Sequence, residues 1–222
     1  MCQPHVYSLV NDSAWALGSP TMSTHGRVVT RVLSPARAAM RDRLIDATVE
    51  LATSGGYDAV TIRAVAAHAG VSVPTVYQHA SSRDQLLAEA LLALGQRSTD
   101  DLRDRPPKGK TPAERISSVF QRIMRAAHDN PLLYQALYRG WVVSATEIAN
   151  VDGAPGFGPE RAAWIGEALR AGSTGRHSEE DLQSATRILS CLFLGALIEV
   201  ASGRDLDAVR TIVDEAAHRL LP

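Results

Sequence analysis

Apolar residues recur at intervals of three and four along most of the chain, which is the periodicity of amphipathic helices. The pattern begins after Ser34-Pro35, where a helix-capping serine precedes a proline suited to the first helical turn. The sequence shows neither the alternating pattern of a strand nor an internal repeat. The pattern therefore predicts an all-α fold of about nine helices.

Turn and cap signals divide this pattern into separate helices. Gly55-Gly56 is predicted to end the first one, and Ser82 to Gln85 has the composition of a capping box. Further helices are predicted to begin near residues 61, 72, 82, 111, 130, 159, 178 and 205. The glycines and prolines of 150–159 predict a loop before the helix that begins at Pro159.

Composition also changes along the chain. The first 34 residues lack periodicity, which predicts a disordered arm, and a basic arm that reaches the minor groove through Arg27 or Arg31 is the alternative. Charge, proline and glycine accumulate at 103–111, which indicates a domain boundary. The predicted organisation is an arm over 1–34, a domain over 35–102 and a second helical domain over 110–222.

The charge and cysteine content narrow the class of protein. The formal net charge of −1, with 45% hydrophobic residues, argues against a protein that coats nucleic acid by charge alone. Cys2 and Cys191 offer neither a disulfide framework nor metal-ligand spacing, which fits the reducing cytoplasm. The sequence begins without a signal-peptide pattern, and the apolar run at 188–201 is too short to span a bilayer. We expect a cytoplasmic protein without a membrane partner.

The most specific local pattern lies in residues 61–80 and matches the steric demands of a helix-turn-helix. Such a motif needs a small residue where its helices cross, here Ala66, and a residue tolerant of positive φ in the turn, here Gly70. Apolar anchors are also needed, and they are present as Val65, Ala69, Val71 and Val76. These spacings predict a DNA-binding helix-turn-helix.

The second motif helix carries the side chains predicted to face DNA. Ser72 is a good N-cap that can also hold a phosphate, and the first two turns of a recognition helix meet base edges. Pro74 removes a donor there, so base reading is expected to rely on contact with thymine methyl groups. The residues in those turns are Val73, Pro74, Thr75, Tyr77 and Gln78.

The run from Thr61 to His79, with Gly56-Tyr57 before it and 82–87 after it, resembles the signature of the TetR family of transcription regulators over about residues 38–98. The resemblance implies that Thr61 caps its helix against a phosphate, and that Arg83 replaces a phosphate-gripping lysine. It places Ser72, Thr75, Tyr77 and His79 against DNA. Ala80 departs from the aromatic residue that the resemblance implies at this position, where it would help to hold the recognition helix.

Four residues of this region have a simpler alternative role. Tyr77 can be a core tyrosine, His79 a surface cap and Thr61 a plain helix cap, while Arg63 fits a solvated charge. The predicted DNA-binding set is Thr61, Ser72, Val73, Pro74, Thr75, Tyr77, Gln78, His79 and Arg83.

The same resemblance implies a ligand cavity in the C-terminal helices and a homodimer formed by the last two helices. The run at 188–201 is apolar on nearly all sides and contains Gly195, which suits contact with a second copy or burial within one chain. His128 and Arg139 are candidates for a polar ligand head, with a surface role as the alternative. Candidate pocket residues, each of which can instead be core, are Phe120, Met124, Tyr134, Leu137, Tyr138, Trp141, Trp164 and Phe193.

Two short stretches narrow the resemblance further. Residues 130–133 and Gly140-Trp141 resemble the actinobacterial steroid-degradation repressors of this family, which respond to acyl-thioesters of coenzyme A. The resemblance implies a repressor that is released from a palindromic operator by a small molecule, either an apolar compound or an acyl-CoA. An activator, or a helical architectural or interaction protein without a ligand, is the alternative.

Enzymatic function is not expected from the sequence. It contains no metal-ligand spacing, nucleophile elbow, P-loop or dinucleotide-binding fingerprint. The seven histidines are scattered without a catalytic pattern. We therefore expect neither a cofactor nor a catalytic residue.

Overall fold

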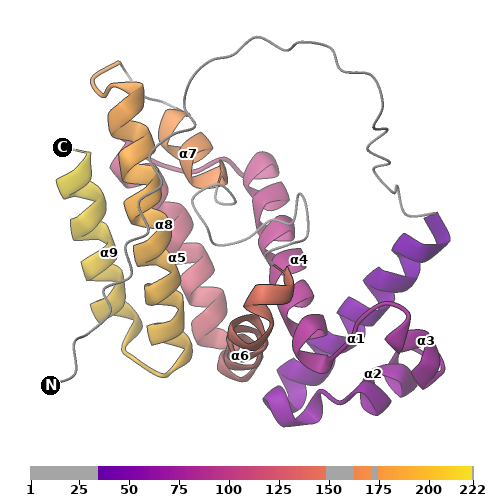
Figure 1. Cartoon of the computed structure of the whole chain (residues 1–222). Coiled ribbons are helices and arrows are strands. Elements are labelled where there is room, and N and C mark those ends of the chain that lie inside the picture. Colours follow the sequence, from indigo (N-terminus) through magenta and orange to yellow (C-terminus); the bar gives the residue numbers. More distant parts are fainter. Residues whose placement is uncertain (1–34, 149–162, 172–174, 222) are drawn as a thin grey trace, which may run out of the picture. The chain divides into compact units, whose positions relative to one another are not determined.

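The computed structural model describes residues 35–148, 163–171 and 175–221, and these form nine helices and no strand (Figure 1). The prediction of an all-α fold is confirmed. The helices are α1 (Pro35–Ala59), α2 (Ile62–His68), α3 (Val73–Tyr77), α4 (Arg83–Asp104), α5 (Pro112–Asp129), α6 (Pro131–Ile148), α7 (Ala163–Arg170), α8 (Glu179–Ala201) and α9 (Leu206–Leu220). The predicted arm at 1–34, the loop at 150–159 and the helix start at Pro159 lie outside the described residues.

The predicted end of the first helix is a break rather than an end. Gly56 has a φ of 65° and a ψ of −157°, which only glycine adopts without strain, and one further turn carries α1 to Ala59. The break places Tyr57 beside α4, where its hydroxyl donates to Asp84 Oδ1 at 2.7 Å. Gly56 thus sets the direction in which the Tyr57 side chain points from the last turn of α1.

A partly buried ion pair holds α4 against α1. The Glu89 carboxylate is 8% exposed and accepts from Arg41 Nε and Nη2, both at 3.1 Å. Gln85 donates to Glu89 at 3.0 Å, and its other amide atom accepts from the backbone and hydroxyl of Ser81. The predicted capping box is therefore shifted: Ser82 caps the Gln85 amide at 3.1 Å, and Gln85 returns its bond to Ser81.

The C-terminal helices share one aromatic cluster. Phe120 of α5 stacks on Phe193 of α8 with ring centroids 4.0 Å apart, and Trp164 of α7 meets both rings edge-on. Helix α8 packs along α5 and α9, and α7 packs on α5 and α8 (Figure 1). At 23 residues, α8 exceeds the apolar run read from the sequence and is long and apolar enough to cross a membrane, as buried core helices also can be.

Helix α6 packs both on the N-terminal helices and on the C-terminal helices. It packs against α1 and α4 on one side and against α8 on another, where Gln135 donates to the Ala201 carbonyl at 2.7 Å. Helix α4 is also long, because its 22 residues span about 33 Å. The residues 105–111 connect α4 to α5, and the domain boundary predicted there stays a prediction.

Candidate nucleic-acid interface

Helices α2 and α3 are held in the geometry expected of a helix-turn-helix. Val65 and Ala66 are buried where the helices meet, and the Val71 amide donates to the Ala66 carbonyl at 2.9 Å. Gly70 turns the chain with a φ of 64°, a region that costs other residues free energy. Arg43 of α1 reaches across and donates to the Ala69 carbonyl, so α1 holds the turn in place.

The recognition helix α3 is short and is fixed at both ends. The Ser72 hydroxyl accepts from the Thr75 amide at 3.3 Å and shares a hydrogen bond with the Thr75 hydroxyl at 2.8 Å. Val76 is fully buried beneath the helix, and the Ala80 amide donates to the Val76 carbonyl at 3.0 Å. Ala80 is itself buried, so a small residue packs at this position.

The outer face of α3 presents several of the predicted side chains to solvent. Tyr77 is 57% exposed, which excludes the alternative that it is a buried core tyrosine. Pro74 and Gln78 are exposed, and His79 is half-buried. Two members of the predicted set have structural duties as well: Val73 packs partly on the core, and Thr61 caps α2 by accepting from the Ala64 amide at 3.1 Å.

The basic side chains near this face differ in how they are held. Arg63 is exposed on α2, while His68 lies 2.6 Å from the Glu50 carboxylate. Arg83 begins α4, is half-buried and places its guanidinium carbon 4.0 Å from the centre of the Tyr57 ring. The contact with Tyr57 therefore restricts the conformations of the Arg83 side chain.

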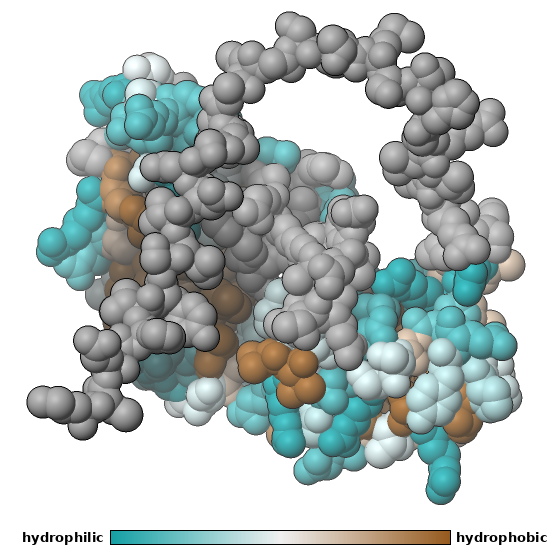
Figure 2. Space-filling model, in the orientation of Figure 1, coloured by the Kyte–Doolittle hydropathy of each residue, from teal (hydrophilic) through white to brown (hydrophobic). Residues whose placement is uncertain are grey.

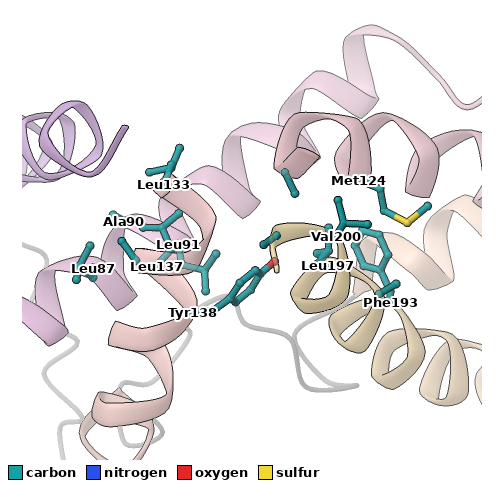
Figure 3. Packing of buried hydrophobic residues seen from close by; sticks show 14 of the residues in the cluster. Leu87, Ala90, Leu91, Met124, Leu133, Leu137, Tyr138, Phe193, Leu197 and Val200 are labelled. Atoms are coloured by element: carbon teal, nitrogen blue, oxygen red, sulfur yellow. The ribbon is translucent and has the colours of Figure 1, made fainter. Parts of the chain in front are cut away.

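A second candidate site is a small apolar cavity of about 50 Å³ between α4, α5, α6, α7 and α8. Four of the eight predicted pocket residues line it: Tyr134, Tyr138, Trp164 and Phe193. Tyr138 extends from α6 with its hydroxyl end toward α8 (Figure 3). Within the part of the chain that the structure describes, the lining is Leu91, Leu94, Gly95, Ser98, Ile123, Tyr134, Tyr138, Trp164, Phe193 and Leu197.

The other four predicted pocket residues do not line this cavity. Phe120, Met124 and Leu137 are fully buried in the core, and Trp141 packs beside Ala88 and Leu92. His128 is exposed, and Arg139 stacks on Tyr57. The sequence analysis does not predict the lining residues of α4, because it places this helix in the DNA-binding domain. The 22 residues of α4 nevertheless carry its C-terminal half away from the helix-turn-helix and into the cavity wall.

The electrostatics of the cavity favour an uncharged occupant. None of the described residues that line it is acidic or basic. Burial raises the pKa of the Tyr134 phenol and raises the pKa of Tyr138 well above its ordinary value, with the neighbouring Tyr134 adding to the second shift. Both hydroxyls are therefore neutral around pH 7 and suit a neutral polar group on an otherwise apolar molecule.

A third feature is an exposed apolar stripe on α8, formed by Ile188, Cys191, Gly195 and Ile198. Ile188 is 47% exposed and Ile198 is 41% exposed, and hydrophobic surface is visible over α8 (Figure 2). Steps of three, four and three residues put these positions along one line of the helix, as in a helix–helix seam. Ile212 on the neighbouring α9 is 46% exposed as well.

Comparison with known proteins gives consistent results. Residues 44–90 match the model of the family described as bacterial regulatory proteins, tetR family. The HTH-type transcriptional repressor KstR of Rhodococcus jostii is 33% identical over 166 residues, which cover 74% of each chain. The repressor of the same name from Mycolicibacterium smegmatis is 35% identical over 172 residues, covering 74% of this chain and 78% of that one.

Solved structures show the same fold at lower identity. A TetR transcriptional regulator from Rhodococcus sp. RHA1 has a TM-score of 0.67 at 22% identity and covers 84% of this chain and 97% of its own. A TetR transcription regulator from Haloarcula marismortui has a TM-score of 0.59 at 21% identity, covering 83% of this chain and all of its own.

Proposed function

Because this chain belongs to the TetR family of bacterial regulatory proteins and is a DNA-binding transcriptional repressor, we propose that two copies bind a palindromic operator and that a small-molecule ligand releases them. The exposed outer face of α3 is the observation that carries the DNA-binding part of this proposal. It offers Pro74, Tyr77 and Gln78 to a major groove while Val76 holds the helix from beneath. Thr61, Ser72 and Arg83 then contact phosphates on either side.

The experiment that tests the proposal is selection of bound fragments from the genome that encodes the protein, followed by titration of the recovered DNA. A repressor of this kind selects an inverted repeat with half-sites about one helical turn apart, and its affinity falls steeply with salt. Binding without preference among sequences would contradict the proposal and favour an architectural DNA protein. A failure to bind any fragment at low salt would favour an interaction protein.

Tyr77→Ala is expected to weaken operator binding by roughly tenfold or more, the loss that one groove contact typically causes. Its melting temperature is expected to stay within one or two degrees, because Tyr77 is 57% exposed. Fluorescence anisotropy with the selected operator measures the first quantity and calorimetry the second. Val142→Ala, which truncates an apolar side chain that is 70% exposed on α6, is the control and should change neither. Unaltered affinity in Tyr77→Ala would remove this residue from the interface.

We assign the stripe on α8 and the neighbouring Ile212 to a two-fold interface with a second copy. A two-fold contact covers the same apolar side chains on both copies. Gly195 permits close approach, because a Cβ there meets no described residue within 4 Å. Such a dimer can place two recognition helices in successive major grooves, about 34 Å apart. It also accounts for why α8 is apolar on a face where Ile188 and Ile198 are exposed among the described residues.

The cavity is the proposed ligand site, and α6 is the proposed connection to DNA binding. Tyr138 lines the cavity, whereas Gly140, two residues later, lies against α4, where a Cβ would be 2.4 Å from Leu87 Cβ. At about 50 Å³ the cavity is smaller than the roughly 300 Å³ of typical ligand pockets, so a bulkier ligand must displace lining side chains. Displacement of Tyr138 would shift α6 against α4 and so favour a dimer that does not fit the operator.

The chemistry of the lining favours an apolar ligand with a neutral polar group. An acyl-CoA remains the other candidate, with its acyl part in the cavity and its charged part outside it. We propose that the protein acts in the cytoplasm by binding rather than by catalysis. Among the residues that the structure describes, no three histidine, cysteine or acidic side chains form a group able to hold a metal ion.

Gly95→Leu is expected to weaken release by ligand while leaving operator binding intact. Gly95 lines the cavity from α4, and a Cβ there meets no described residue within 4 Å, so a leucine side chain can extend into the cavity. Leucine also has a higher helix propensity than glycine. The measurement is release of labelled operator by a panel of apolar compounds and their CoA thioesters. The affinity for the releasing compound is expected to fall by tenfold or more, as loss of one ligand contact of roughly 1.4 kcal/mol implies. Equal release from both proteins would place the ligand elsewhere.

A further inference from the structure

We infer that Arg139 of α6 is a positioning residue that holds Arg83 at the DNA phosphate through the ring of Tyr57. The inference rests on the proposed function, because it takes Arg83 as a DNA contact. It adds a residue from a different helix, 56 positions away along the chain from Arg83, to the machinery of binding.

Two arginines lie against one tyrosine ring. The guanidinium carbons of Arg83 and Arg139 are 4.0 Å and 3.7 Å from the centre of the Tyr57 ring. Two groups of this size cannot share one face at such distances, so they lie on opposite faces and the ring is enclosed between them. Each guanidinium gains from the negative potential of the ring face, and each limits the tilt of the ring.

The remaining contacts fix this stack in the fold. The Tyr57 hydroxyl donates to Asp84 Oδ1 at 2.7 Å, which prevents rotation of the ring and offsets part of the charge of the two arginines. Gly140, next to Arg139, brings the backbone of α6 against α4, with its Cβ position 3.0 Å from the Asp84 carbonyl oxygen. The stack therefore joins α1, α4 and α6 at the residue where α4 begins.

This arrangement lowers the cost of a phosphate contact from Arg83. A free arginine side chain loses rotamer freedom when it binds a phosphate, whereas a stacked one has lost much of that freedom already. The ring of Tyr57 limits Arg83 on one side, and Arg139 keeps the ring in place from behind. Arg139 itself is exposed on α6, a helix that packs against α1, α4, α5 and α8, and its contact toward Arg83 is the ring of Tyr57. Its effect on DNA therefore passes through Tyr57.

The test compares operator binding of Arg139→Gln, Arg139→Lys and Arg83→Gln, alone and combined, over a range of salt concentrations. Arg139→Gln is expected to weaken binding about two- to fivefold, as loss of a cation–π contact from an exposed arginine implies. It should also lower the salt slope by up to about 0.9, the value of one lost phosphate contact. In a chain that already carries Arg83→Gln, the same change should have little further effect. Arg139→Lys should retain most of the affinity, because an ammonium group also binds a ring face.

Two tyrosine variants separate the stack from the hydrogen bond. Tyr57→Leu removes both faces and should reproduce Arg139→Gln, while Tyr57→Phe keeps the ring and should bind nearly as well as the unchanged protein. The inference is overturned if Arg139→Gln leaves affinity and salt slope unchanged, if its effect adds fully to that of Arg83→Gln, or if glutamine and lysine weaken binding equally. Absence of operator binding by the unchanged protein would instead refute the proposed function.

Discussion

Ile198→Glu is expected to convert the protein to a monomer and to weaken binding to a two-half-site operator by at least about 100-fold, because linked binding to both half-sites is then lost. Ile198 is 41% exposed in a single chain, so one copy tolerates a glutamate there. In a two-fold interface the substitution occurs twice, and each carboxylate must leave water for an apolar contact without a partner. The cost falls on association and not on the folding of one chain.

Light scattering and operator titration measure the two effects, and Cys191 provides an independent check. It is exposed and unpaired in the centre of the stripe, so a short bis-maleimide should link two copies in a chain that also carries Cys2→Ser. Cross-linking should disappear with Ile198→Glu. The matched control is Val142→Glu, an equal change at an exposed valine on α6, which should remain dimeric. A cross-linked, operator-binding dimer of Ile198→Glu would refute this interface.

The helices could be predicted because their signals are local. Caps such as Ser178, whose hydroxyl and amide both bond with Asp181, depend on residues three apart. Gly70 is equally local, since a positive φ in a four-residue turn selects glycine whatever surrounds it. The helix-turn-helix combines such local signals at fixed spacing, and its fold therefore followed from the sequence alone.

The cavity and the tyrosine stack could not be predicted in the same way. Phe120 and Tyr134 both fall on apolar helix faces, yet Phe120 is fully buried behind Phe193 whereas Tyr134 lines the cavity. Only the packing of five helices separates core from lining. The contact of Tyr57 with Arg139 joins residues 82 positions apart, and no periodicity relates them. Spacing indicates which face of a helix is apolar but not which other helix covers it.

Gly140→Ala is expected to lower the free energy of unfolding by about 2–3 kcal/mol, the usual cost of overpacking a well-filled contact. The added Cβ would lie 2.4 Å from Leu87 Cβ and 3.0 Å from the Asp84 carbonyl oxygen, and neither atom is the end of a flexible side chain. Helix α6 must therefore move away from α4, although alanine gains up to about 1 kcal/mol in helix propensity. Chemical denaturation at one fixed protein concentration measures the difference, because dimer stability depends on concentration.

Gly95→Ala is the matched control, since it makes the same change at a helical glycine of α4 whose Cβ position has no described residue within 4 Å. Without a clash only the propensity gain remains, so its free energy of unfolding should rise by about 0.5–1 kcal/mol. The two variants are thus expected to differ in sign. The contact that Gly140→Ala disturbs lies at Asp84, the residue after Arg83. Gly140→Ala should therefore also weaken operator binding, whereas Gly95→Ala should not. A stabilised Gly140→Ala protein with full operator affinity would show that α6 and α4 are not in close contact at this point, and would remove the physical basis for coupling the cavity to DNA through α6.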